Sequence, residues 1–236
     1  MKILVVVAHP DDEVLGMGGT IKKLSKAGNE IKTIFLSTGI LARRPFQPKS
    51  SNNVLTEKFF RAYEKKISEL RRDARSAAKV LGISEIDFMD FPDNEMDLIS
   101  NLQLTKTIEN EIMNYKPSTI YMPTKYDVNV DHQAVYNATV TATRPQKNMF
   151  VQNVISFEIP SSTEWYFPAE FSPNLFIDIT KEFKSKTNAL KKYKNEIRKF
   201  PHPRSIDALE AIAKRWGSVS GFQYAEAFNL VRKLEP

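Results

Sequence analysis

The sequence predicts a Rossmann-like α/β fold, with a mainly parallel β-sheet and helices on both faces. Strand-like and helix-like segments alternate through the first two-thirds of the chain. Residues 2–8 form a continuous, β-branched apolar run, which is typical of a strand buried on both faces. At 236 residues the chain can bury a full core within one domain, so we expect residues 1–236 to form a single domain.

The first half of the chain shows the alternation most clearly. A helix is expected over residues 13–27, because Gly28 is suited to end it, and a strand follows at residues 31–36. Apolar residues spaced three and four apart then predict a long helix over residues 53–81. Gly82 is its expected C-terminal stop.

The second half is predicted in the same way, from apolar runs and helical spacing. The further strands expected are residues 86–89, 119–122, 153–158 and 174–179. The further helices expected are residues 100–114, 131–143 and 181–200, with a C-terminal helical stretch from residue 205 onward. Parallel strands joined by helices require right-handed crossovers, so the helices would cover both faces of the sheet.

Composition excludes several classes of protein. No apolar run approaches the roughly 18 residues that a membrane span needs, so no span is expected. The short apolar run at the N-terminus is followed by three acids, which fits a buried strand better than a secretory signal. The chain has no cysteine, which excludes disulfides and cysteine-ligated metals. We expect a cytoplasmic protein.

The net charge of +6 is concentrated in one segment. Residues 181–200 contain eight basic and two acidic residues, with apolar residues at helical spacing. A solvated surface helix is the favoured interpretation. The alternative is a positive field that attracts an anionic substrate, such as a nucleotide-linked or diphosphate-linked sugar. Nucleic acid is not an expected partner, because no nucleic-acid motif accompanies the charge.

A histidine and three consecutive acids follow the first predicted strand directly, as His9, Asp11, Asp12 and Glu13. Acids at a helix N-terminus stabilise the helix dipole by about 0.3–1 kcal/mol each, which accounts for one or two of them. The dipole does not explain a histidine three residues before Asp12. His9 and Asp12 could both reach one cation, with Pro10 fixing the turn between them, so the segment predicts a metal site.

A second polar segment, residues 127–132, follows the predicted strand at residues 119–122. A lone histidine at a helix start is more often a surface or capping residue than a ligand. Ligands of open α/β sheets bind outside the carboxyl ends of the strands, however, and both polar segments lie there. His9, Asp12 and His132 together provide two histidines, a carboxylate and an open position, a standard arrangement for catalytic zinc.

The segment AHPDDEVLGMGGTI resembles the hallmark of the LmbE-like (PIG-L) deacetylases, and Asp131-His132 resembles their second metal motif. The similarity extends over nearly the whole chain, through RRDARSAAKVLG, FPDNEMD, FPHPRS and YAEAF. Members of this family hydrolyse the N-acetyl group of glucosamine-type sugars in small thiols, nucleotide sugars, lipid-linked sugars or glycans. The resemblance implies a hydrolase that deacetylates a small-molecule or glycan amino sugar of the N-acetylglucosamine type.

The resemblance also implies the catalytic residues. His9, Asp12 and His132 would bind Zn²⁺, with Fe²⁺ or Co²⁺ as alternatives, and Asp11 would be the general base. Zinc suits amide hydrolysis because it lowers the pKa of bound water toward about 7 and polarises the carbonyl group. Asp11 would take the proton of the water and could later pass it to the leaving amine.

The resemblance further implies residues that contact the substrate. Asp93 would bind substrate hydroxyls, and Asp131 is a further expected substrate residue. Arg71 would contact the sugar. Its surroundings depart from the family's usual Arg-x-x-Glu, because Asp73 and Ala74 follow.

One departure from the family concerns the oxyanion. Many relatives carry a histidine three residues before the ligand histidine, where this chain has Asn129. An amide can donate a hydrogen bond to an oxyanion, but it cannot donate a proton. We hypothesise that His202 reaches the site and supplies part of this role, with Arg204 nearby for an anionic or hydroxyl-rich substrate. The alternative is a histidine in a rigid, proline-flanked surface loop.

Other functions are weighed against this one. A non-haem iron oxygenase also uses two histidines and a carboxylate, but usually as His-x-Asp/Glu on a β-sandwich strand. A basic protein that binds anionic ligands around a structural metal would normally offer four protein ligands and no spare base. A zinc amidase that cleaves a larger acyl-amino-sugar conjugate keeps the same residues and stays an open alternative. The exact sugar, its carrier and the oligomeric state also stay open.

Overall fold

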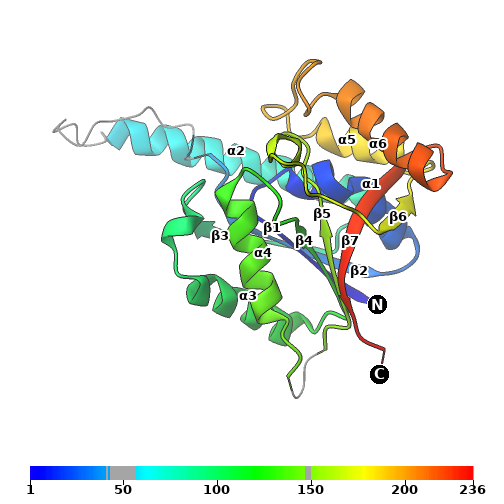
Figure 1. Cartoon of the computed structure of the whole chain (residues 1–236). Coiled ribbons are helices and arrows are strands. Elements are labelled where there is room, and N and C mark those ends of the chain that lie inside the picture. Colours follow the sequence, from blue (N-terminus) through cyan, green and yellow to red (C-terminus); the bar gives the residue numbers. More distant parts are fainter. Residues whose placement is uncertain (41, 43–56, 147–149, 236) are drawn as a thin grey trace.

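The computed structural model describes residues 1–40, 42, 57–146 and 150–235, and of residues 57–62 it describes the backbone alone. A seven-stranded sheet forms its centre (Figure 1). The strands are β1 (Lys2–Val7), β2 (Glu30–Ser37), β3 (Glu85–Phe91), β4 (Thr119–Pro123), β5 (Asn153–Phe157), β6 (Leu175–Asp178) and β7 (Ala225–Lys233). The helices are α1 (Asp12–Lys26), α2 (Glu57–Leu81), α3 (Asn101–Tyr115), α4 (Val130–Ala142), α5 (Phe183–Leu190) and α6 (Ile206–Ser220), with short 3-10 helices η2 (Met96–Leu98) and η3 (Thr163–Trp165).

The strands are ordered β3-β2-β1-β4-β5-β7-β6 across the sheet. The first five strands of the chain pair in parallel, whereas β7 lies antiparallel between β5 and β6. The α/β fold with a mainly parallel sheet, predicted from the sequence, is confirmed.

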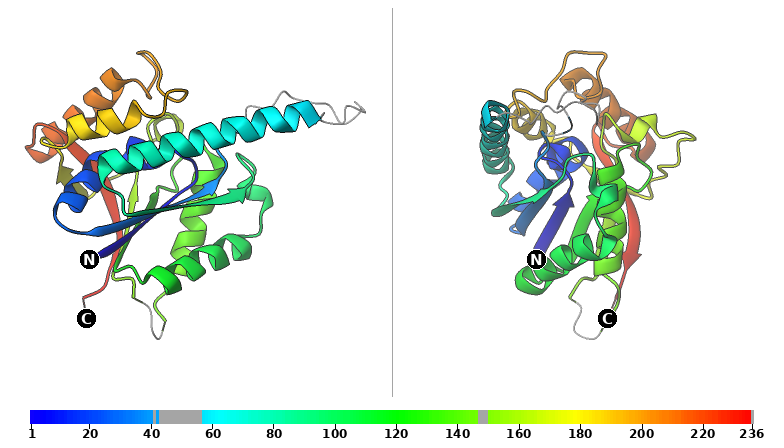
Figure 2. Two further views of the ribbon diagram at one scale, coloured as in Figure 1. Left: turned by 180° about the vertical axis from the view of Figure 1, so that it is seen from behind. Right: turned by 90° about the vertical axis from the view of Figure 1, so that its left-hand side faces the viewer.

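Helices cover both faces of the sheet. α1, α2 and α5 lie on one face, and α3 and α4 lie on the other (Figure 2). β1 runs between these layers, with Ile3 and Val5 in one hydrophobic cluster and Leu4 and Val6 in the other. Burial on both faces explains why this strand is apolar without alternation.

The strand order creates a crevice at the carboxyl end of β1. From β1 the chain moves to β2 and β3 on one side and then returns to β4 on the other. Such a reversal leaves an opening outside the carboxyl ends of the two central strands. Residues 9–12 follow β1 and residues 124–132 follow β4, so the fold brings both predicted polar segments to one place.

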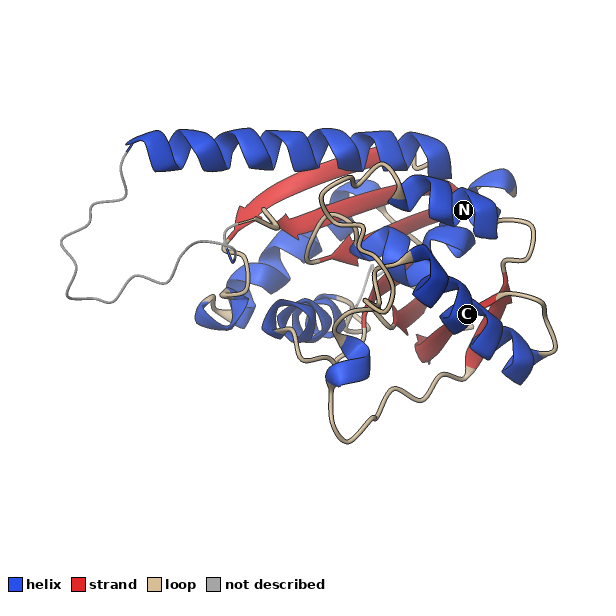
Figure 3. Cartoon of the chain, turned by 90° about the horizontal axis from the view of Figure 1, so that it is seen from above, coloured by secondary structure: helices blue, strands red, loops and turns tan. Residues whose placement is uncertain are grey.

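The long helix α2 runs along one side of the sheet and extends past the strands (Figure 3). Its described part begins at Glu57 and ends at Leu81, before Gly82 with a φ of 81°. The stop predicted at this glycine is therefore confirmed. The first predicted residues of the helix, 53–56, lie outside the described residues.

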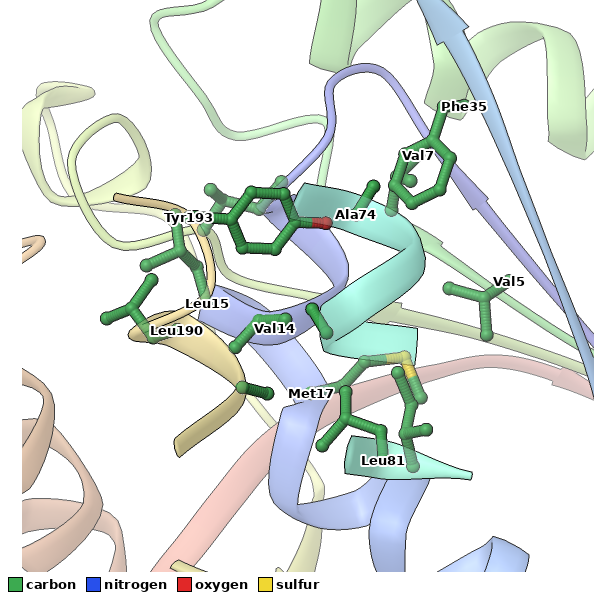
Figure 4. Close-up of a cluster of buried hydrophobic side chains, with 14 of the residues drawn as sticks. Val5, Val7, Val14, Leu15, Met17, Phe35, Ala74, Leu81, Leu190 and Tyr193 are labelled. Carbon is green, nitrogen blue, oxygen red and sulfur yellow. The ribbon is translucent and has the colours of Figure 1, made fainter. Parts of the chain in front are cut away.

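The basic segment is only partly helical, contrary to the prediction over residues 181–200. α5 ends at Leu190, and turns follow it. The side chain of Tyr193 is fully buried among α1 and α5 residues, including Leu15 and Leu190 (Figure 4). Burial of this ring draws the chain inward, so the segment does not continue as a solvated helix.

The C-terminal stretch was predicted as helical throughout and is helical only to Ser220. Gly221, with a φ of 80°, ends α6, and β7 follows from Ala225. Alanine and glutamate favour helices, so AEAF resembles a helix in composition. Pairing with β5 and β6 outweighs this local preference, because four consecutive residues from Ala225 to Phe228 become buried.

The glycine-rich turn of α1 packs closely, as its sequence suggests. A Cβ at Gly16 would overlap the Phe157 ring, and one at Gly19 would lie 2.8 Å from Ile179. Met17 has a non-helical φ of −141°, so α1 is broken between these glycines. The close approach of α1 to the end of β5 therefore requires Gly16, and its approach to the residue that follows β6 requires Gly19.

Within the described residues, no helix combines the length and the apolar character needed to cross a membrane. The single-domain organisation and the cytoplasmic location remain predictions.

Candidate active site

The two polar segments meet above the carboxyl ends of β1 and β4. His9 and Asp12 lie in the turn from β1 into α1, and His132 lies in the first turn of α4. Asp12 and His132 are buried, with 1% and 2% of their surface exposed. The loop that leads from β3 into η2 is close as well, because the backbone N–H groups of Asn94 and Met96 donate to the Asp131 carboxylate.

Asp12 lies between the two histidine rings. Its Oδ2 atom is 3.5 Å from Nδ1 of His9 and 3.3 Å from Nε2 of His132. The backbone N–H of His9 donates to the same oxygen at 2.7 Å, which fixes the carboxylate in the turn. One potential ligand atom from each of these three residues lies within 4.8 Å of the others.

Each histidine also contacts a buried carboxylate through its second ring nitrogen. His9 Nε2 is 2.9 Å from Asp131 Oδ2, and His132 Nδ1 is 3.1 Å from Asp127 Oδ2. Metal-binding histidines usually donate their other ring N–H to a carboxylate, which sets the tautomer and the orientation of the ring. Both rings are therefore oriented with one nitrogen toward Asp12, as a shared metal ligand set requires.

Two buried atoms of this cluster have no hydrogen-bond partner. They are Oδ1 of Asp12 and Nε2 of His132. Buried polar atoms are rarely left without a partner, because the loss of hydration costs about 1–3 kcal/mol. A cation between the three side chains would satisfy both atoms, so His9, Asp12 and His132 fit a zinc ion.

The charges of the cluster support the same conclusion. Burial would lower the pKa of His132, but the neighbouring Asp12 and Asp127 carboxylates raise it to about 9. Burial would likewise lower the pKa of His9, yet hydrogen bonds to Asp12 and Asp131 raise it well above its usual value. A divalent cation would interact with the same carboxylates, and the histidines would bind it in their neutral form.

Asp11 lies next to Asp12 in the chain but faces a different group. Its backbone has a φ of 117°, a conformation that non-glycine residues rarely adopt. Its Oδ2 atom accepts a hydrogen bond of 2.8 Å from Arg204 Nη1. Burial raises the pKa of Asp11 to about 7, and Arg204 opposes the rise. A carboxylate with such a pKa is suited to exchange protons near neutral pH.

A cleft of about 370 Å³ opens above these residues. Its polar lining includes His9, Asp11, Asp93, Asn94, Asn129, Glu196 and Arg204. The cleft gives a small substrate access to Asp11 and to His9 at the edge of the histidine cluster.

Comparison with known proteins identifies the family. The model of the PIG-L family, described as GlcNAc-PI de-N-acetylase, matches residues 4–143. The chain belongs to the PIG-L family. A diacetylchitobiose deacetylase from Thermococcus kodakarensis is 27% identical over 238 residues, which cover 98% of this chain and 83% of that relative.

Solved structures share the fold of this PIG-L chain. A diacetylchitobiose deacetylase from Pyrococcus horikoshii has a TM-score of 0.71 at 21% identity and covers 98% of this chain and 84% of its own. A 4-carboxy-2-hydroxymuconate hydratase from Pseudomonas putida has a TM-score of 0.73 at 19% identity and covers 100% and 98%. The fold thus supports more than one reaction, whereas the family model and the sequence relatives establish this chain as an N-deacetylase.

Three residues expected to act on the substrate are not among the residues that line the cleft. Asp131 is fully buried beneath His9, where it supports the ring and does not line the cleft. Arg71 pairs with Asp90 at another hollow of the surface. His202 is not among the described residues that line the cleft, and its Nδ1 accepts the backbone N–H of Arg204 at 3.1 Å.

The environment of His202 does not favour a proton donor. Partial burial and the nearby Arg204 and Arg198 lower the pKa of His202. Its ring packs edge-on against Trp165, with 6.5 Å between the ring centroids. The geometry therefore supports the alternative of a proline-flanked loop over a catalytic His202.

Sequence reasoning assigned no role to Asp127 or Glu196, which both contact residues of the site. Asp127 accepts hydrogen bonds of 2.8 Å from Ser162 and Thr163 besides its contact with His132. Glu196 accepts a 2.9 Å bond from Arg204. Asp127 could have been suspected from its place in the same polar segment as His132. Glu196 lies in a lysine-rich segment, and no sequence signal distinguishes it.

Proposed function

We propose that this chain is a zinc-dependent hydrolase that removes the N-acetyl group from an N-acetylglucosamine-type amino sugar. The observation that carries the proposal is the pair of adjacent carboxylates, Asp11 and Asp12, with separate surroundings. Asp12 lies between two histidines, as a metal ligand would, whereas Asp11 lines the cleft beside Arg204. The diacetylchitobiose deacetylase among the relatives supports an amino sugar as the substrate.

His9, Asp12 and His132 would hold the zinc ion. When bound there, zinc supplies a Lewis acid that lowers the pKa of a water molecule and polarises the amide carbonyl. Asp127 and Asp131 keep the two rings oriented, because each lies at the ring nitrogen that faces away from Asp12. Asp131 thus acts on the histidine and not on the substrate.

Asp11 acts as the general base. Its carboxylate lines the cleft and accepts the proton of the attacking water. The same carboxyl group then donates that proton to the leaving amine, which restores the ionised base. Its pKa of about 7 suits both transfers, because neither protonation state is strongly favoured near neutral pH.

Asn129 supplies a hydrogen bond to the oxyanion. Its side-chain Oδ1 accepts the backbone N–H of Asp131 at 2.9 Å and so caps α4. This use of the oxygen turns the Nδ2 amino group away from the helix, and Asn129 lines the cleft. An amide N–H placed there can stabilise negative charge on the carbonyl oxygen as it develops.

Asp93 and Asn94 bind hydroxyl groups of the sugar. Both residues line the cleft, and both follow β3 in the chain. Asp93 is anchored by the backbone N–H of Ala42 at 2.8 Å, and its pKa is lowered by His9 despite burial. An ionised, fixed carboxylate is a good acceptor for the hydroxyl groups of a sugar.

Measurement of acetate release tests the proposal. Purified protein is loaded with Zn²⁺ and incubated with N-acetylglucosamine, diacetylchitobiose and nucleotide-linked N-acetylglucosamine. On at least one of these compounds, we expect each turnover to release one acetate and to leave one free amine. Chelation of the metal should abolish turnover. Fe²⁺ and Co²⁺ are added back in parallel with Zn²⁺, and the metal that gives the highest kcat identifies the preferred ion.

Two results would contradict the proposal. One is turnover that survives complete removal of the metal. The other is release of a longer acyl group, but not acetate, from matched N-acyl glucosamines, which would favour an amidase acting on larger conjugates.

A further inference from the structure

The loop between α5 and α6 places a guanidinium group against the base of the site. Arg204 Nη1 donates to Asp11 Oδ2 at 2.8 Å and to Glu196 Oε2 at 2.9 Å. Its Nε donates to Ser161 Oγ at 2.7 Å. Arg204 is therefore tied to three residues that lie far apart in the sequence.

The backbone of this loop is fixed independently of Asp11. The N–H of Arg204 donates to His202 Nδ1, and its carbonyl accepts the N–H of Arg198 at 3.4 Å. Pro201 and Pro203 restrict the loop further, because a proline ring fixes φ. The arginine consequently approaches Asp11 from a rigid support, and His202 contributes to that support.

Both carboxylates that Arg204 contacts are buried. The side chains of Asp11 and Glu196 are each 2% exposed, whereas that of Arg204 is 24% exposed. A guanidinium held between two buried carboxylates cannot move away from them without leaving both charges uncompensated, which costs several kcal/mol. Arg204 is thus committed to these partners and is poorly placed to serve as a mobile substrate ligand.

We propose that Arg204, held by Glu196, is a positioning residue that orients the Asp11 carboxylate for proton transfer. Arg204 engages Oδ2, which leaves Oδ1 as the oxygen that meets the attacking water. A base must lie within hydrogen-bond reach of the proton it accepts, so rotation of this carboxylate would slow the reaction. The inference rests on the proposed function and revises the expectation that Arg204 binds substrate.

Kinetic constants of Arg204→Ala separate positioning from substrate binding. We expect kcat to fall by about 10- to 100-fold, as displacement of a reacting group does, while KM changes by less than about threefold. Added guanidinium should restore kcat at least in part, whereas urea at the same concentration should not, because it carries no charge. Arg198→Ala is the matched control, because Arg198 lies on the same segment, is exposed and contacts backbone carbonyls; its kinetics should equal those of the wild type.

A raised KM with unchanged kcat, and no effect of guanidinium, would overturn the inference and show that Arg204 binds substrate. Crystal structures of Arg204→Ala and Arg204→Lys give a test that does not depend on turnover. We expect the Asp11 carboxylate to rotate or lose its order in the alanine variant and to keep its orientation in part in the lysine variant. An Asp11 side chain that is unchanged in both variants would overturn the inference, even if the wild-type protein deacetylated none of the substrates offered.

Discussion

Asp11 and Asp12 show how one residue step in the chain separates two functions. The φ of 117° at Asp11 reverses the backbone direction just before α1 begins. As a result, Asp12 faces His9 and His132, while Asp11 faces Arg204. Positive φ costs about 1–3 kcal/mol for a residue with a side chain, and such strain is usually kept where function requires it.

Substitution of Asn129 tests the oxyanion contact without loss of the helix cap. Asn129→Ser keeps an oxygen that can accept the N–H of Asp131 but removes the amide donor. We expect kcat to fall by about 10²-fold or more, with little change in the free energy of unfolding. Asn129→Ala should lose the same activity and, in addition, about 1 kcal/mol of stability. A serine variant with a kcat within about threefold of the wild type would exclude the oxyanion role.

Asp127 should control metal affinity through His132. Asp127→Asn keeps the size of the side chain but weakens the contact that orients the ring. We expect the dissociation constant for Zn²⁺, measured by competition with a chromophoric chelator, to rise by about 10- to 100-fold. Exposed Asp97 provides the control, since Asp97→Asn should leave zinc affinity unchanged. Equal affinities of wild type and Asp127→Asn would contradict this role.

Residues of the site could be predicted from the sequence when they lie close together in the chain or match a motif. His9, Asp12 and His132 come together as expected, because two strand ends meet at the reversal of strand order. Glu196 and the roles of Asp131 and Arg204 were not predictable. They depend on side-chain directions across the cleft, and these are set by tertiary contacts that no local pattern records.

At the scale of elements, α1 is held together by a buried ion pair. The Glu226 carboxylate from β7 accepts the N–H groups of Gly19 and Thr20, after the break at Met17. Lys186 from α5 donates to the Leu15 carbonyl before the break and to Glu226. The pair satisfies backbone groups that the break leaves without helical partners, so it joins the two halves of α1.

Removal of one partner of this pair should be costly. Lys186→Met leaves the Glu226 charge buried and uncompensated, and we expect a loss of about 3–5 kcal/mol in the free energy of unfolding. Lys184, on the same helix, is exposed, and Lys184→Met should change stability by less than about 0.5 kcal/mol. Urea unfolding of both variants gives the comparison. A similar, small effect of the two substitutions would show that the pair contributes little.

Glu158 links β5 to α6 and should make stability depend on pH. It accepts a hydrogen bond from the Trp216 indole, and burial raises its pKa from 4.5 to about 7. Between pH 4.5 and pH 7, the Glu158 carboxyl group is therefore protonated in the folded state but ionised in the unfolded state. The contribution of Glu158 to the free energy of unfolding thus falls as the pH rises over this range. Glu158→Gln cannot titrate, so relative to the wild type it should gain about 3 kcal/mol between pH 4.5 and pH 8. Equal pH profiles of the two proteins would contradict the shift.

The parallel half of the sheet was predictable mainly because β1, β2, β4 and β5 are buried almost continuously and are therefore largely apolar. The prediction of a helix where β7 lies was wrong, and the ion pair between Lys186 and Glu226 gives the physical reason. Glu226 places a charged residue among four consecutive buried positions, and only its contacts with Lys186 and α1 make that burial favourable. Neither the strand nor the buried glutamate can be inferred from residues nearby in the chain.

At the scale of the whole molecule, the fold brings distant segments to a single cleft. The proposed metal ligands come from the turns after β1 and β4, the predicted hydroxyl ligand Asp93 follows β3, and Arg204 comes from the loop before α6. The reversal of strand order brings these segments together, and the side chains of their local turns provide the polar groups of the cleft. A hydratase shares this fold, so the reaction is argued from the side chains of the cleft and not from the architecture.

The central claim is that Asp12 binds the metal while its neighbour Asp11 transfers the proton. Zinc content and kcat, measured together on Asp11→Asn and Asp12→Asn, test it most directly. Asparagine tolerates positive φ, so it suits the backbone at position 11. The account predicts that Asp11→Asn keeps its zinc and loses about 10²- to 10⁴-fold in kcat, whereas Asp12→Asn loses the zinc. Normal turnover by Asp11→Asn, or full zinc binding by Asp12→Asn, would contradict it.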